Sequence, residues 1–92
     1  MSKMCIHCCI HGQVQGVGFR YFTKRQANKY TITGWVRNLL NGTVEVLACG
    51  NKDNIEQFIQ CLKQGPVSAK VDKIISDDQP WQEFTEFSII KQ

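Results

Sequence analysis

A glycine-rich segment followed by an arginine is the part of the sequence best suited to bind an anion. Gly12-Gln13-Val14-Gln15-Gly16-Val17-Gly18 places three glycines in seven residues, and Arg20 follows it. Glycine tolerates the positive φ angles that turn successive N–H groups toward one point, and such a nest before a helix binds phosphate. The planar guanidinium of Arg20 can bind two phosphate oxygens. We predict a phosphate site made by Arg20 and by the backbone amides of Gln15, Gly16, Val17, Gly18 and Phe19; a plain glycine turn beside a surface arginine is the alternative.

This segment matches neither of the common nucleotide-binding loops. The pattern G-x-x-x-x-G-K-[ST] lacks its lysine here, and Tyr21 occupies the third glycine position of G-x-G-x-x-G. The sequence therefore predicts a phosphate site without predicting a nucleotide.

Hydrophobic periodicity and turn residues predict the elements that hold the glycine-rich segment. The expected strands are Met4–His11, Ile32–Asn38, Thr43–Cys49, Val67–Ile75 and Phe84–Ile89, and the expected helices are Arg20–Tyr30 and Asn51–Gln64. Asn41-Gly42 is expected to be a hairpin turn and Asp77–Gln82 a loop. This order predicts an α+β fold of the ferredoxin-like split βαβ type, βαββαβ plus a short C-terminal strand. The antiparallel sheet would carry two helices on one face, with the first and third strands side by side.

Composition limits the classes of function. The chain has 92 residues, expected to form one domain over residues 1–92, and its 42% apolar and 21% charged residues are typical of a soluble globular protein. A net charge of +3 favours a small anion but is too small for a dedicated nucleic-acid surface. We find no apolar run of ~20 residues and no signal-peptide pattern in Met1 to His11, so we expect a cytoplasmic protein that binds neither membrane nor nucleic acid.

Two segments resemble the signatures of the acylphosphatase family. The first is Gly12 to Arg20, and the second is Gly34-Trp35-Val36-Arg37-Asn38 followed by Gly42-Thr43-Val44-Glu45. The resemblance covers essentially the whole chain and implies the ferredoxin-like fold. It also implies hydrolysis of a small-molecule acyl phosphate to a carboxylate and inorganic phosphate, without metal or cofactor.

The same resemblance assigns roles to two residues of this sequence. Arg20 would bind the phosphoryl group and Asn38 would orient the attacking water. Leu39 and Gly18 differ from the residues of some members, and neither difference removes a catalytic group. Phosphate or sulfate is expected to bind at the same place, and a monomer is the expected state.

Three other functions stay open from the sequence. Met4 to His11 holds three cysteines and two histidines, and some small metal chaperones use a pair of cysteines. Cys5 and Cys8 would point to opposite faces of a strand and so could not bind the same ion. Cys5, His7, Cys9 and His11 would share one face, where a metal ion could bind. An RNA-recognition module has the same strand order, but the third strand here has no aromatic residue. The chain also resembles the acylphosphatase-like domain of larger carbamoyl-transfer enzymes.

The cysteines predict at most one cross-link. Five cysteines at irregular spacing do not suit a disulfide framework, and Cys8 suits the core. Antiparallel pairing of the first and third strands places Cys5 near Cys49 on the face away from the helices. We predict a disulfide between them under oxidising conditions and two free thiols in a reducing cytoplasm.

Overall fold

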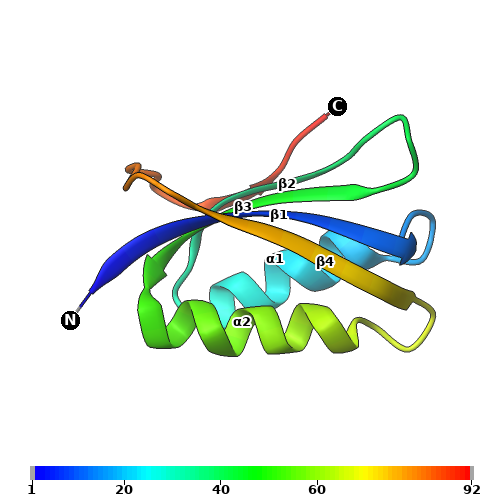
Figure 1. Cartoon of the computed structure of the whole chain (residues 1–92), viewed down its shortest axis with the longest axis horizontal. Coiled ribbons are helices and arrows are strands. Elements are labelled where there is room, and N and C mark those ends of the chain that lie inside the picture. Colours follow the sequence, from blue (N-terminus) through cyan, green and yellow to red (C-terminus); the bar gives the residue numbers. More distant parts are fainter. Residues whose placement is uncertain (1, 92) are drawn as a thin grey trace.

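A five-stranded sheet with two helices on one face makes up the protein (Figure 1). The computed structural model describes residues 2–91. The elements are β1 (Lys3–Gln13), α1 (Phe19–Lys29), β2 (Thr33–Asn38), β3 (Val44–Asn51), α2 (Lys52–Gln64), β4 (Lys70–Gln79) and β5 (Phe87–Ile89). The strand order is β4-β1-β3-β2-β5, so β1 and β3 are neighbours as predicted. The predicted ferredoxin-like arrangement is confirmed.

Pairing in the sheet is antiparallel except at one edge. β1 pairs antiparallel with β3 and with β4, and β2 pairs antiparallel with β3. The sequence predicted a terminal strand over Phe84–Ile89 without a partner, and the structure has β5 over Phe87–Ile89 only, paired parallel with β2. Phe87 explains its position, because this buried side chain packs edge-on against Phe58 of α2 with ring centroids 6.1 Å apart. One aromatic anchor therefore fixes a strand of only three residues.

The main core lies between the helices and the sheet. Every second residue of β1 from Cys8 to Ile10 and of β3 from Val44 to Ala48 points into it, as the period of two in a strand requires. Helix α1 contributes Phe19, Thr23 and Ala27, and α2 contributes Ile55, Phe58 and Leu62. Burial of each large apolar side chain stabilises the fold by roughly 1.5–3 kcal/mol.

Strand β4 differs from its predicted bounds. It was expected over Val67–Ile75, but Val67 and Ser68 form a turn closed by the hydrogen bond from the Ala69 N–H to the Pro66 carbonyl at 3.0 Å, and β4 begins at Lys70. The prediction of a loop over Asp77–Gln82 is wrong for its first three residues. β4 continues to Gln79, which pairs with Cys5 of β1. These residues are polar because β4 is an edge strand, so no alternating apolar pattern marks them.

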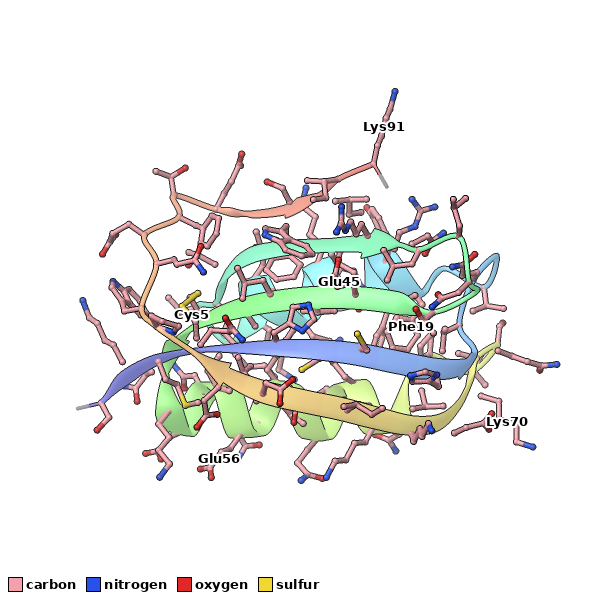
Figure 2. All side chains as sticks on the ribbon, turned by 45° about the horizontal axis from the view of Figure 1, so that its top comes forward. Cys5, Phe19, Glu45, Glu56, Lys70 and Lys91 are labelled. Carbon is pink, nitrogen blue, oxygen red and sulfur yellow. A yellow bond between two sulfur atoms is a disulfide. The ribbon has the colours of Figure 1, made fainter. Side chains whose placement is uncertain are left out.

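The face of the sheet away from the helices carries a smaller apolar cluster. Cys5, Leu47 and Cys49 are buried there under Trp35 and Phe84. Cys5 and Cys49 lie directly opposite each other and form a disulfide, the yellow bond beside the Cys5 label in Figure 2. The connection from β4 to β5 crosses over this bond, and the Gln82 N–H donates to the Cys5 Sγ at 3.2 Å. Within residues 2–91 no helix has the length and apolar character to cross a membrane.

Candidate active site

The glycine-rich loop lies between β1 and α1 and is anchored by two valines. Val14 is buried and Val17 packs against the main core, while Gly16 and Gly18 are exposed. Gly16 has φ 74° and Gly18 φ 78°, and a Cβ at either position would meet nothing within 4 Å. Glycine is therefore required for backbone conformation and not for space. The valines hold the loop while the glycines turn its backbone.

The N-terminus of α1 follows the loop without a capping side chain. The Phe22 N–H donates to the Gly18 carbonyl at 3.0 Å, so the amides of Phe19, Arg20 and Tyr21 precede the first helical hydrogen bond. Gly18 occupies the N-cap position, and the first turn contains no acidic residue. The partial positive charge of the helix end is therefore left for an external anion.

A pocket of about 270 Å³ joins the loop to the end of β2. It is lined by Val14, Gly16, Gly18, Phe19, Arg20, Tyr21, Asn38 and Ile89. Arg20 and Asn38, distant in sequence, thus face the same space. Of the predicted site residues, Gln15 and Val17 do not line the pocket. Val14, Tyr21 and Ile89 line it without having been predicted.

Asn38 has a buried polar atom that nothing in the protein satisfies. It is the last residue of β2, paired with Val44 of β3. Its Oδ1 is buried, and among residues 2–91 it has no hydrogen-bond partner. Leaving a buried acceptor unpaired costs roughly 1–3 kcal/mol. A hydrogen-bond donor that enters the pocket, such as a water molecule, would remove this cost.

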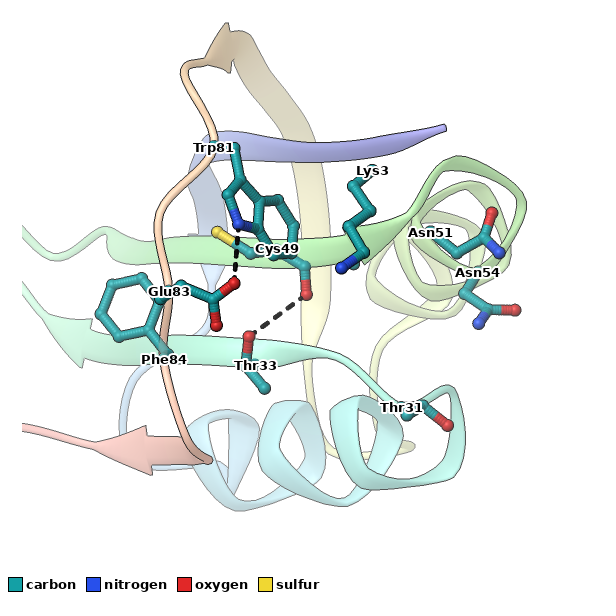
Figure 3. A pocket seen from close by; sticks show the side chains of 10 residues that line it. Lys3, Thr31, Thr33, Cys49, Asn51, Asn54, Trp81, Glu83 and Phe84 are labelled. Carbon is teal, nitrogen blue, oxygen red and sulfur yellow. Dashed lines mark hydrogen bonds between the residues drawn. The ribbon is translucent and has the colours of Figure 1, made fainter. Parts of the chain in front are cut away.

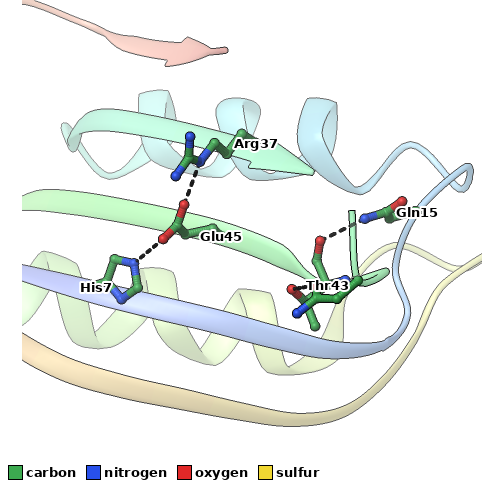
Figure 4. Close-up of polar contacts among 6 residues, drawn as sticks. His7, Gln15, Arg37, Thr43 and Glu45 are labelled. Atoms are coloured by element: carbon green, nitrogen blue, oxygen red, sulfur yellow. Dashed lines mark hydrogen bonds and ion pairs between the residues drawn. The ribbon is translucent and has the colours of Figure 1, made fainter. Parts of the chain in front are cut away.

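The two arginines of the signature segments are in opposite situations. Arg20 is exposed, and in the described part of the chain its guanidinium makes no ion pair and no hydrogen bond. Arg37 donates from Nε to Glu45 Oε1 at 2.5 Å, and His7 Nε2 lies 2.6 Å from Glu45 Oε2 (Figure 4). Of these two arginines, Arg20 is therefore the one whose guanidinium has no partner within residues 2–91.

A larger hollow of about 450 Å³ lies at the opposite end of the sheet (Figure 3). Trp81 Nε1 donates there to Glu83 Oε1 at 3.0 Å, and Thr33 Oγ1 donates to the Cys49 carbonyl at 3.5 Å. These groups are already paired with each other, in contrast to Asn38 and Arg20. Size alone therefore does not make this hollow the better site.

The cysteines and histidines of β1 do not form a metal site. Among residues 2–91 no three His, Cys, Asp or Glu side chains are placed to hold an ion. Cys5 is in the disulfide, and His7 is paired with Glu45. Burial raises the pKa of Cys8 to about 12, so this thiol stays protonated, and burial also raises the pKa of Cys9. The geometry does not support the metal-chaperone hypothesis.

Fold and site together define a small α+β domain in which a glycine loop, a helix N-terminus and the end of β2 line one pocket. Comparison with known proteins gives the family. The family model described as Acylphosphatase matches residues 6–89. The acylphosphatase of Legionella pneumophila (strain Corby) is 42% identical over 89 residues, which cover 97% of this chain and 98% of that protein. The chain belongs to the acylphosphatase family of enzymes.

Solved structures agree with this assignment. An acylphosphatase from Coxiella burnetii superposes with a TM-score of 0.92 at 35% identity, covering 96% of this chain and 93% of that one. One from Bacillus subtilis gives 0.92 at 36% identity, with 95% and 98% covered. HypF of T. kodakarensis also matches, with a TM-score of 0.84 and 34% identity, but the match covers 99% of this chain and only 12% of HypF. The predicted likeness to a domain of larger enzymes is thus a likeness to a small part of them.

Proposed function

We propose that the protein hydrolyses the carboxyl–phosphate bond of small acyl phosphates, with Arg20 and the loop amides holding the phosphoryl group and Asn38 orienting the water. The observation that carries this proposal is the unpaired, buried Oδ1 of Asn38 in the same pocket as the unpaired guanidinium of Arg20. An acceptor suits a water molecule, and a cation suits a phosphoryl group. The pocket therefore offers one partner to each reactant.

Binding would use backbone and side-chain donors together. The amides of residues 15–19 belong to a turn in which Gly16 and Gly18 have positive φ angles, and the α1 N-terminus adds its partial positive charge. Arg20 would donate two parallel hydrogen bonds to phosphoryl oxygens. In a loose phosphoryl-transfer transition state charge lies on the equatorial oxygens, so the same donors would stabilise it.

The chemical step would need little beyond positioning. The water oxygen forms a bond to phosphorus while the bond from phosphorus to the acyl oxygen breaks, and the carboxylate leaves with the electron pair. Asn38 Oδ1 would accept a hydrogen bond from the water and so direct its lone pair toward phosphorus. An amide cannot take a proton at neutral pH, so the proton passes to a phosphoryl oxygen. A carboxylate is a good leaving group and does not require a general acid.

The experiment that tests this proposal is hydrolysis of benzoyl phosphate by the purified protein in excess chelator. We expect full turnover with chelator, because charge stabilisation comes from the protein alone. Arg25→Ala is the matched control for Arg20→Ala, since Arg25 is exposed on the same helix outside the pocket. No turnover by the wild-type protein would overturn the proposed function, and turnover that chelator removes would overturn its metal independence.

Phosphate or sulfate is proposed to occupy the same pocket. Phosphate should raise Tm through linkage, because it binds the folded protein. Equal stabilisation of wild type and Arg20→Ala would place the anion elsewhere. A monomer and a cytoplasmic location remain part of the proposal, to be tested by light scattering and by cell fractionation.

A further inference from the structure

The side chain of Gln15 connects the phosphate loop to the hairpin between β2 and β3. Its Nε2 donates to two backbone carbonyls, those of Leu39 and Thr43, both at 2.8 Å. Figure 4 shows Gln15 reaching from the loop to Thr43. The side-chain NH₂ group of Gln15 therefore uses both of its hydrogens, one for each carbonyl oxygen. The sequence predicted a role only for the backbone amide of this residue.

The hairpin that receives these bonds is itself held by several hydrogen bonds. The Leu39 N–H donates to the Thr43 carbonyl at 2.9 Å, and the Gly42 N–H donates to the Leu39 carbonyl at 3.2 Å. The Asn41 side chain accepts from the Thr43 N–H at 3.1 Å and from the Thr43 hydroxyl at 2.6 Å. Gln15 therefore binds a turn whose shape is already fixed.

The position of this turn matters because Leu39 directly follows Asn38. β1 and β2 are not paired with each other but only through β3, and the loop that follows Gln13 lies outside the sheet. The Gln15 side chain spans the two halves of the proposed site directly. On one side is the loop proposed to hold the phosphoryl group, and on the other is the residue next to the proposed water ligand.

We propose that Gln15 is a positioning residue that sets the distance and angle between the bound phosphoryl group and the water held by Asn38. This inference rests on the proposed function. Without the Gln15 side chain each half would keep its own groups, but the two would no longer be held in register. A misplacement of about 1 Å at a reacting centre can cost about a hundredfold in rate.

The test is a double-mutant cycle on kcat with Gln15→Met and Asn38→Ala. Methionine keeps the length of the side chain and removes both donors. We expect Gln15→Met to lower kcat by roughly ten- to a hundredfold while the inhibition constant of inorganic phosphate changes by less than about threefold. In the Asn38→Ala background we expect less than about threefold further loss, because Gln15 acts through the water that Asn38 holds.

Two further variants and one control make the result specific. Gln15→Asn keeps the amide but shortens the side chain by one methylene, so it should lose as much kcat as Gln15→Met. Gln15→Glu should lose more, because a carboxylate oxygen would face two carbonyl oxygens. Thr33→Val removes a side-chain hydrogen bond to a carbonyl at the opposite end of β2 and should leave kcat unchanged. Circular dichroism would verify that each variant is folded, and Gln15→Asn replaces Gln15→Met if the latter is not.

Three outcomes would overturn the positioning role. They are full kcat in Gln15→Met, independent and multiplicative losses in the double mutant, and a loss of phosphate affinity as severe as that of Arg20→Ala. Failure of the proposed function would look different, because the wild-type protein itself would then turn over no benzoyl phosphate.

Discussion

The pocket and the uncovered face of the sheet treat their polar groups in opposite ways. On the uncovered face Glu45 receives hydrogen bonds from both His7 and Arg37. In the pocket Asn38 Oδ1 has no partner within residues 2–91, and the first turn of α1 has no acidic residue. The uncovered face pairs its charged groups with one another, whereas the pocket leaves Asn38 Oδ1 without a partner in the described part of the chain. Substitutions on the uncovered face should change stability alone, and substitutions in the pocket should change activity alone.

The largest effect is expected from Arg20→Ala. The proposed roles predict that kcat for benzoyl phosphate falls by about a thousandfold or more, the scale seen when an arginine that stabilises a phosphoryl transition state is removed. Thermal stability should hardly change, because Arg20 makes no ion pair in the described part of the chain. Steady-state kinetics and a melting curve check both points. A large fall in Tm would mean that Arg20 belongs to the fold as much as Arg37 does.

Removal of the disulfide should produce the largest change in stability. Cys5 and Cys49 are 44 residues apart, and the chain-entropy model gives about 4 kcal/mol for a loop of this length. We expect Cys5→Ala with Cys49→Ala, or reduction of the wild type, to lower the free energy of unfolding by this order while kcat stays unchanged. Denaturant titration measures the change. Cys61→Ala is the control, because Cys61 is a free thiol. A parallel loss of kcat would contradict the separation of the two regions.

Asn38→Ala should lower kcat by about a hundredfold, the scale of losing one transition-state hydrogen bond. Phosphate inhibition should stay near the wild-type value, in contrast to Arg20→Ala. Tm should change by less than about 4 °C, because no hydrogen bond within residues 2–91 is lost from Oδ1. Competitive inhibition measured beside kcat distinguishes the two residues. Full turnover in Asn38→Ala would remove it from the proposed mechanism.

The smallest effect concerns the acid stability of the uncovered face. Burial raises the pKa of Glu45, but hydrogen bonds from His7 and Arg37 lower it more, so its pKa lies below the ordinary 4.5. Its contribution to stability is therefore present above pH 4.5 and is lost as the pH falls through the lowered pKa. We expect Glu45→Gln to reduce the loss of stability below that pH by less than about 1 kcal/mol. Melting curves from pH 3 to pH 6 for both proteins test it, and identical acid dependence would contradict it.

The sequence was most informative where local pattern and core packing coincide. Asn41-Gly42 predicted the hairpin, and the period of three and four predicted α2, which the structure begins one residue later with Asn51 as its N-cap. Cys5 opposite Cys49 followed from strand order alone and agrees with the register. These features depend on neighbours in sequence or on simple antiparallel geometry.

Other features could not be predicted because they depend on distant contacts. Gln15 looked like any loop glutamine until its side chain was seen to reach residues 39 and 43. Ile89 lines the pocket because β5 pairs parallel with β2, and a strand of three residues carries no periodicity. The end of β4, residues 77–79, was predicted to be a loop because its residues are polar and show no alternating apolar pattern. The phosphoryl-binding role of the loop and Arg20 stays a prediction from the sequence, and the structure adds the hydrogen bonds by which Gln15 joins the loop to the hairpin.

The disulfide also makes a covalent ring. Cys5 and Cys49 close a loop of chain that contains the whole proposed site, from the phosphate loop and Arg20 to Asn38. The most exposed large side chain of the hairpin, Leu40, lies in the same ring. A protease that cut the chain once at Leu40 would therefore release nothing from the oxidised protein. The two pieces would stay joined at high effective concentration, and only reduction would separate them.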